Sequence, residues 1–220
     1  MTQLTARDMQ VLHYLLENKC ASVDVIAQRF FAVSASTGER NGDPRHAAAR
    51  RLQTLSDEGL LRMNTQRLRT QGLATLVVAT AEGAAKGGSR MPGAVPTKGL
   101  DHHVATLRAL TKAREQLAAE GLAVVEERLE FQVRSAAQGG RATVAGEEFD
   151  AFPDGLVVVV DVTGRRLTMA VEYVTSKYTD QMIVEKDNDF AGYARKLWVA
   201  DSPRTAARVS RLVGGPCACT

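Results

Sequence analysis

Apolar residues in the first sixty positions recur at three- and four-residue intervals, which is the period of an amphipathic helix. The pattern predicts three helices, over residues 4–18, 22–30 and 44–58. Thr5 and Asp8 have the spacing of a capping box at the start of the first helix, and Asp43-Pro44 is a typical start for the third. The short connection between the first two helices favours a helix-turn-helix.

Two apolar runs follow and predict strands at 60–63 and 74–80, joined by the polar and basic segment 64–72. Three helices followed by a hairpin is the order of a winged helix-turn-helix, which we expect over residues 1–85. The expected tip of the wing contains Gln66, Arg67, Arg69, Thr70 and Gln71. Helix 44–58 is then the expected reading element.

Residues 86–100 are rich in glycine and proline, which favours a linker between two domains. Beyond it, apolar spacing predicts helices at 101–120, 180–196 and 203–212, and strands at 123–133, 156–162, 167–174 and 197–200. The order of these elements is αβββαβα. We therefore expect an α+β protein with a second domain over 101–213 and a flexible tail over 214–220.

Basic residues are concentrated in the first part of the chain. Residues 1–90 contain twelve Lys and Arg against eight Asp and Glu, whereas residues 100–220 contain fifteen against seventeen. Within the first part, residues 40–70 alone contain seven basic and three acidic residues. Clustered positive charge attracts the phosphates of nucleic acid, so we expect double-stranded DNA as the partner of the first domain.

Arginine reads base edges and also contacts phosphates, and both roles are expected on the third helix. Arg45 and His46, near its start, are candidates for base readout, and Arg50 and Arg51 for phosphate contact. Arg67 and Arg69 of the wing are expected to contact the DNA backbone or the minor groove. The alternative is that this helix presents a solvated face in a winged helix that binds another protein.

Two acidic residues of the second domain are candidates for metal chemistry. Asp154 precedes the predicted strand 156–162, and Glu172 lies among apolar residues in the next predicted strand. Hard oxygen ligands on neighbouring strands suit Mg²⁺, which assists phosphodiester cleavage. The alternative is that Glu172 is a buried acid paired with a neighbouring Lys or Arg.

The αβββαβα order, with Pro153-Asp154 and Glu172 on the two strands of a hairpin, resembles the PD-(D/E)XK nuclease-like fold. The whole chain, a winged helix followed by such a domain, is similar to the replication-relaxation family of plasmids and other mobile elements. The resemblance spans residues 4–212. It implies a sequence-specific DNA-binding regulator, or an accessory factor in replication or mobilisation.

One position departs from the nuclease pattern. The motif has Lys two residues after the Glu, where it orients or activates the attacking water, and this chain has Val174 there. The nearest lysine is Lys177, and Lys186 follows in the next predicted helix. We therefore expect a binding protein with an inactive nuclease-like domain. The alternative is a Mg²⁺-dependent endonuclease or nickase that uses Asp154 and Glu172, with Lys177 as a displaced catalytic lysine.

Other classes of function are not favoured by the sequence. The chain has no P-loop, no dinucleotide-binding glycine motif and no H-E-x-x-H, so no nucleotide cofactor is expected. No apolar run has the length of a membrane span, and no secretory signal opens the chain, so we expect a cytoplasmic protein with no membrane partner. A homodimer is an open alternative, which the sequence does not test.

Overall fold

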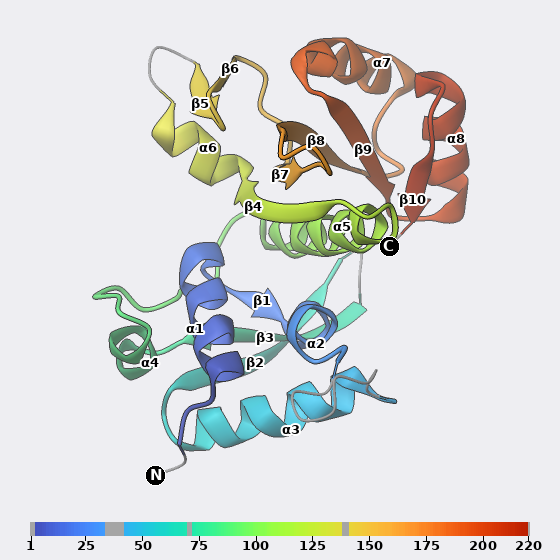
Figure 1. The fold of residues 1–220 in the computed structure, drawn as a ribbon. Coiled ribbons are helices and arrows are strands. Elements are labelled where there is room, and N and C mark those ends of the chain that lie inside the picture. The colour runs from blue at the N-terminus through green and yellow to red at the C-terminus, as the bar shows by residue number, and fades with distance from the viewer. Residues whose placement is uncertain (1–2, 34–41, 70–71, 138–140, 220) are drawn as a thin grey trace. The chain divides into compact units, whose positions relative to one another are not determined.

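A computed structural model describes residues 3–33, 42–69, 72–137 and 141–219 of the chain (Figure 1). The chain divides into two compact units, Met1–Leu107 and Arg108–Thr220, and the division falls inside helix α5 (Leu100–Ala119). The predicted α+β class is confirmed, because helices and strands are mixed in both units. In the described part of the chain, no helix has the length and hydropathy needed to cross a membrane.

The first unit packs helices around a small antiparallel sheet. Its elements before α5 are α1 (Ala6–Asn18), β1 (Ala21–Ser22), α2 (Val23–Phe30), α3 (Pro44–Asp57), β2 (Leu61–Leu68), β3 (Gly72–Ala79) and α4 (Ala81–Lys86). Strand β3 lies between β1 and β2 in the sheet. The three predicted helices are present, and the caps read from the sequence form: the Thr5–Asp8 capping box, Ser22 and Asp43.

The hairpin of β2 and β3 is longer than the sequence predicted. Gln66 and Arg67 lie within β2 and pair with residues of β3, so the expectation that they form the tip is wrong. The polar run sustains a strand because its last residue, Leu68, is buried against Ala74 and Leu76, while the intervening side chains face solvent. Arg69 follows β2, and the predicted tip residues Thr70 and Gln71 lie outside the described residues.

The second unit is built on a five-stranded sheet in the order β10-β9-β8-β7-β4. Its elements after α5 are β4 (Ala123–Leu129), α6 (Glu130–Ala136), β5 (Ala142–Val144), β6 (Glu147–Phe149), β7 (Gly155–Val160), β8 (Arg166–Val174), α7 (Asp180–Asp189), the 3-10 helix η1 (Phe190–Gly192), β9 (Arg195–Ala200), α8 (Pro203–Val213) and β10 (Cys217–Cys219). Strands β4, β7 and β8 are antiparallel neighbours, whereas β9 runs parallel to β8 and β10 runs parallel to β9.

The two faces of this sheet are covered by different helices. Gly155 of β7 is so close to α5 that a Cβ atom there would lie 2.8 Å from Leu110 Cδ2. The alternate residues, Leu156 of β7 and Ala170 of β8, pack in one cluster with Phe190. Further along β8, Val174 packs with residues of α7, β9 and α8. Because side chains alternate along a strand, Glu172 shares the face of Ala170 and Val174, towards α7 and α8.

Three features of the second unit differ from the prediction. The strand expected over 123–133 ends at Leu129, because helix α6 begins at Glu130, with the Gln132 side chain accepting a hydrogen bond from Leu129 N at 2.6 Å. The helix expected over 180–196 ends at Asp189, and β9 already begins at Arg195. Part of the expected flexible tail is strand β10, which pairs with β9.

Candidate functional site

The hairpin of β7 and β8 brings Asp154 and Glu172 together. Asp154 immediately precedes β7, and the register pairs Gly155 with Val171, which places Asp154 beside the last residues of β8. Tyr173 N donates a hydrogen bond to Asp154 Oδ2 at 2.9 Å, and Asp154 N donates one to Glu172 Oε2 at 3.2 Å. Asp154 and Glu172 are therefore adjacent, as predicted, and each side chain accepts a hydrogen bond from a main-chain amide of the neighbouring segment.

A lysine from helix α7 reaches the same site. Lys186 Nζ forms an ion pair with Glu172 Oε1, and Tyr178 donates its hydroxyl to the same oxygen at 3.3 Å. Lys186 Nζ also lies over the Tyr178 and Phe190 rings, 5.8 Å and 5.6 Å from their centroids. Thr179 caps the start of α7 by accepting a hydrogen bond from Met182 N, which fixes the helix that carries the lysine.

Burial dominates the electrostatics of Glu172, whose side chain is only 2% exposed. The pKa of Glu172 is raised from 4.5 to about 7, because burial and then the negative charge of Asp154 raise it by more than Lys186 lowers it. Burial, followed by the charge of Glu172, also raises the pKa of Tyr178. The phenol therefore stays protonated near neutral pH and can donate to the carboxylate.

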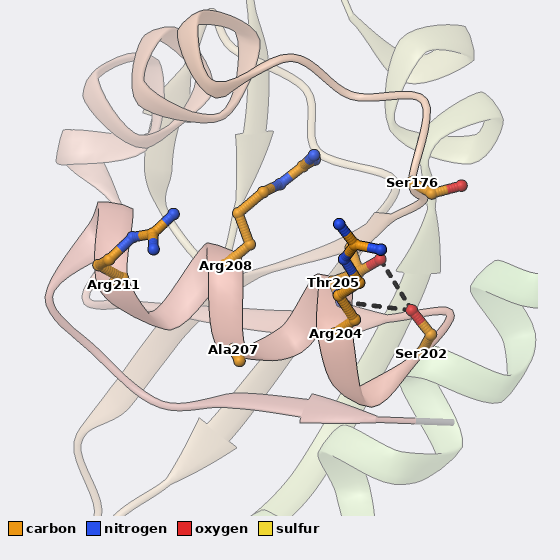
Figure 2. Close-up of a pocket in the computed structure, with 7 residues that line it drawn as sticks. All are labelled: Ser176, Ser202, Arg204, Thr205, Ala207, Arg208 and Arg211. Atoms are coloured by element: carbon orange, nitrogen blue, oxygen red, sulfur yellow. Dashed lines mark hydrogen bonds between the residues drawn. The ribbon is translucent and has the colours of Figure 1, made fainter.

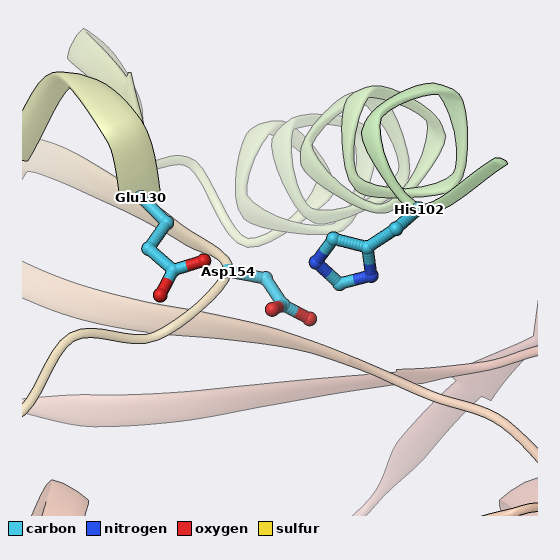
Figure 3. Close-up of side chains that lie close together, drawn as sticks. All are labelled: His102, Glu130 and Asp154. Carbon is cyan, nitrogen blue, oxygen red and sulfur yellow. The ribbon is translucent and has the colours of Figure 1, made fainter. Parts of the chain in front are cut away.

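A third carboxylate lies next to Asp154. Glu130 opens helix α6, and its main-chain amide donates to the Asp154 carbonyl at 2.9 Å. One carboxylate oxygen of Glu130 and one of Asp154 lie within 4.8 Å of each other (Figure 3). Arg134 Nε forms an ion pair of 2.7 Å with Glu130 Oε1. His102, drawn in the same figure, is a residue of the first unit.

The chemistry of this set suits a hard divalent cation. Glu130 and Asp154 offer carboxylate oxygens that lie close together, and Glu172 offers another carboxylate next to Asp154 N; carboxylate oxygens are the donors that Mg²⁺ prefers. The fit requires the carboxylate of Glu172 to exchange its contact with Lys186 for the ion. Without an ion, the buried carboxylate of Glu172 is already paired with the Lys186 amine, the Tyr178 hydroxyl and the Asp154 amide.

Lys177, the lysine that the sequence proposed for catalysis, lies elsewhere. It belongs to the turn after β8, its side chain is exposed, and its main-chain amide donates to Thr175 Oγ1 at 3.4 Å. Val174, at the position of the nuclease lysine, is fully buried among Ile183, Trp198 and Val209. A lysine at that position would be driven into this apolar cluster, so the amine beside Glu172 comes from α7 instead.

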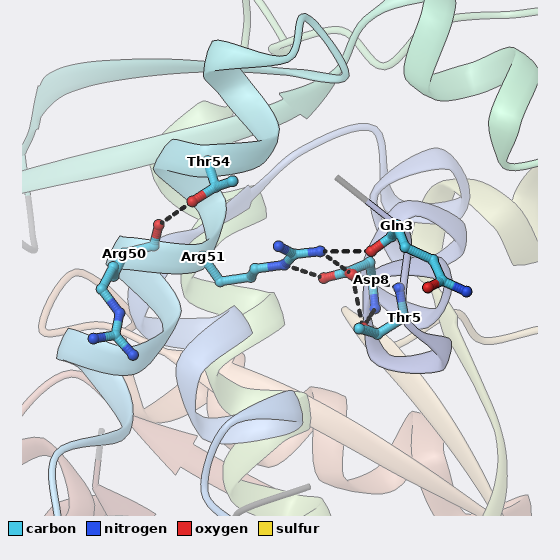
Figure 4. Close-up of polar contacts among 6 residues, drawn as sticks. All are labelled: Gln3, Thr5, Asp8, Arg50, Arg51 and Thr54. Carbon is cyan, nitrogen blue, oxygen red and sulfur yellow. Dashed lines mark hydrogen bonds and ion pairs between the residues drawn. The ribbon is translucent and has the colours of Figure 1, made fainter. Parts of the chain in front are cut away.

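On helix α3, Arg51 is committed to a contact within the first unit. Its guanidinium holds Asp8 by two hydrogen bonds, of 2.9 Å from Nε and 2.5 Å from Nη2, and reaches the Gln3 carbonyl at 3.4 Å (Figure 4). Asp8 is 1% exposed. Burial acts to raise the pKa of Asp8, but hydrogen bonds from Arg51 and Thr5 outweigh it and lower the pKa. Arg51 thus fastens α3 to the start of α1.

The other basic residues predicted to bind DNA are exposed. Arg45 forms an ion pair of 2.9 Å with Asp24 of α2 while its side chain stays 68% exposed. His46 and Arg50 lie on the solvent side of α3, and Arg50 points away from the Asp8 contact in Figure 4. Arg67 is exposed on β2, and Arg69 follows it, its amide donating to Asp101 Oδ1 at 2.5 Å.

Two members of the acidic site were not identified from the sequence. Glu130 was assigned to the middle of a strand, and Tyr178 to a loop. Their places depend on where α6 begins and how the turn after β8 folds back, which residue spacing does not encode. The position of Tyr178 shortly after Glu172 is a sequence signal that could have indicated it, whereas no such signal marks Glu130.

Comparisons with protein-family models, curated proteins and solved structures gave no match for this chain.

Proposed function

We propose that the protein binds double-stranded DNA through its first unit. The proposal interprets that unit as a winged helix, in which the short connection between α1 and α2 is that of a helix-turn-helix, α3 is the reading helix and the β2–β3 hairpin is the wing. It further takes the second unit as a PD-(D/E)XK-like domain, and the chain as a regulator or accessory factor similar to the replication-relaxation family. The antiparallel β4, β7 and β8, with β9 added parallel to β8, support that interpretation.

The observation that carries the proposal is the exposure of basic residues on both predicted DNA-contacting elements. His46 and Arg50 on α3 and Arg67 on β2 present their side chains to solvent, and no ion pair within the described residues occupies Arg50 or Arg67. Asp43 caps α3 by accepting from His46 N at 3.0 Å, so the start of the reading helix is ordered without a ligand. Free guanidinium groups on a rigid helix and strand suit phosphate contact.

A charge-matched pair of variants tests this proposal. Arg50→Gln with Arg67→Gln removes two positive charges from the proposed interface, and Lys86→Gln with Arg90→Gln removes two from exposed positions elsewhere in the same unit. Fluorescence anisotropy with a labelled duplex should show a clear loss of affinity in the first variant and near-wild-type binding in the second. Equal losses would reduce the proposal to nonspecific charge attraction, and no binding by the wild-type protein would end it.

A second candidate function is metal-dependent cleavage of DNA. We expected an inactive domain because Val174 replaces the nuclease lysine. Lys186 of helix α7, however, places an amine at Glu172. Asp154 and Glu130, with Glu172 once it is released from Lys186, would hold a Mg²⁺ ion, which would polarise the phosphate and lower the pKa of an attacking water. Lys186 would then orient that water or stabilise charge on the phosphate oxygens.

Supercoiled plasmid incubated with the full chain and Mg²⁺ or Mn²⁺ distinguishes the two candidates. If the domain cleaves, Asp154→Asn and Lys186→Met abolish the activity, and Lys177→Met, at the exposed lysine, retains it. If the wild-type protein leaves the plasmid intact with either metal, the second unit is a nuclease-like domain without cleavage, and DNA binding by the first unit is the function that stands.

A further inference from the structure

A cavity of about 530 Å³ lies beside helix α8, outside the acidic site. It is bounded by the exposed side of α8, by Ser176 in the turn after β8 and by Ser202 in the turn after β9 (Figure 2). Its lining residues are Ser176, Ser202, Arg204, Thr205, Ala207, Arg208 and Arg211, none of which is acidic. The cavity is therefore lined by three arginines and three hydroxyl groups.

The three arginines occupy successive turns of one helix. Arg204, Arg208 and Arg211 are four and three residues apart, so their side chains leave α8 on the same side, as Figure 2 shows. Like charges at these spacings repel one another and destabilise an isolated helix. An unfavourable arrangement of this kind is offset when an anion binds among the charges.

Two of the three guanidinium groups are not neutralised by the described residues. Neither Arg204 nor Arg211 forms an ion pair with the described residues. Arg208 donates from Nη2 to the Tyr178 carbonyl at 2.5 Å, which aims its guanidinium along the cavity. Its Nε is buried and forms an ion pair of 3.6 Å with Asp180 Oδ1, although it makes no hydrogen bond with the described residues. The exposed guanidinium groups of Arg204 and Arg211 therefore keep their hydrogen-bond donors available to a ligand.

Helix α8 is held rigidly behind these side chains. Val209, on its opposite side, packs with Trp198, Val174 and Ile183 in one buried cluster. Ser202 caps the helix by accepting from Thr205 N at 3.3 Å. The turn of Ser176 is tied to the turn before α8, because Ser176 N donates to Asp201 Oδ2 at 3.0 Å. The helix that carries the arginines is thus anchored by its own buried side and by its cap.

We propose that this cavity is a phosphate-binding site. A guanidinium group donates two parallel hydrogen bonds to phosphate oxygens, and three such groups with a serine hydroxyl match the charge and the acceptors of one phosphate or two linked phosphates. The phosphate belongs either to the backbone of DNA or to a free phosphate-bearing ligand. That DNA supplies the phosphate rests on the proposed function, whereas phosphate binding in the cavity does not depend on it.

Side-chain ¹⁵N NMR of the full chain tests the site directly. Pyrophosphate is titrated into the protein while the Nε–H signals of the arginines are followed. Binding in the cavity predicts saturable shifts of the Arg204, Arg208 and Arg211 signals. The Arg208 shift is lost in Arg204→Gln with Arg211→Gln, and all three shifts are retained in Arg141→Gln with Arg165→Gln, which removes two exposed charges elsewhere in the same unit.

A second titration with a short duplex identifies the source of the phosphate. If the duplex shifts the same signals, the DNA backbone occupies the cavity, and Arg204→Gln with Arg211→Gln lowers the salt slope of DNA binding by about 0.9 for each phosphate that no longer meets a guanidinium group. If pyrophosphate alone shifts them, a free phosphate-bearing ligand is the occupant, whatever the fate of the DNA-binding proposal. The proposal is overturned if neither ligand shifts them, or if the Arg208 shift survives the Arg204/Arg211 change.

Discussion

Asp8 and Arg51 illustrate how a basic residue on a predicted DNA-reading helix can serve the fold instead. Arg51 satisfies a carboxylate that is 1% exposed, and its own side chain is only 23% exposed. The sequence showed its charge and helical position, but not that α1 places an acid against that turn of α3. Residues on one helix face are predictable from spacing, whereas the partner across an interface is not.

Arg51→Met should destabilise the protein by roughly 2–3 kcal/mol, because it leaves the buried Asp8 without its charged partner. The measurement is urea-induced unfolding near neutral pH, with Arg50→Met as the exposed control on the same helix. Because the pKa of Asp8 is lowered in the folded state, its contribution is present above its unfolded pKa and declines as acid protonates the folded form. Equal stability of the two variants would contradict the structural role of Arg51.

Glu172 should give the stability of the protein the opposite pH dependence to Asp8. Its pKa is raised from 4.5 to about 7 in the folded protein, so the folded state binds more protons than the unfolded state between these values. Stability should therefore fall as pH rises from 4.5 to 7, and Glu172→Gln should remove that part of the pH dependence. Urea midpoints measured across this range without added metal test the prediction. It fails if the wild-type protein and the variant show parallel pH profiles.

At the scale of elements, the strongly periodic segments were predictable and the short ones were not. Helices α1, α2 and α3, with their caps, follow from apolar spacing and from Thr5, Ser22 and Asp43. Helix α6 and strand β10 do not, because their apolar residues are too few for a period. Each is fixed by tertiary pairing: Glu130 N with the Asp154 carbonyl, and Cys217 with Trp198 in the sheet.

Gly155 determines how closely α5 approaches the sheet at the start of β7, next to Asp154. Gly155→Ala should cost roughly 1–3 kcal/mol, because the added methyl would lie 2.8 Å from Leu110 Cδ2. Gly192→Ala is a matched control, since no atom lies within 4 Å of a Cβ built there. Combining Gly155→Ala with Leu110→Ala should give a smaller loss than the sum of the two single changes. Strict additivity in urea unfolding would contradict this close approach.

At the scale of the whole molecule, charge and chemistry are divided between two units. The first unit carries the basic surplus of residues 1–90 and exposes it on α3 and β2. The second, which begins at Arg108, contains the buried Asp154–Glu172–Lys186 set and the arginine cavity of α8. The sequence predicted the acidic pair, because Asp154 precedes one apolar strand and Glu172 lies within the next. It did not predict the cavity, because the cavity forms only where the turns of Ser176 and Ser202 lie next to the arginines of α8.

The salt dependence of duplex binding by the full chain tests the central claim most directly. We predict that the logarithm of the association constant falls linearly with the logarithm of salt concentration over about 50–200 mM, with a slope of about −0.9 per neutralised phosphate. Arg50→Gln with Arg67→Gln should make that slope shallower by about 1.8, the amount expected for two phosphates. A wild-type protein with no measurable duplex affinity at the lowest salt, or a slope unchanged by the two substitutions, would contradict the account.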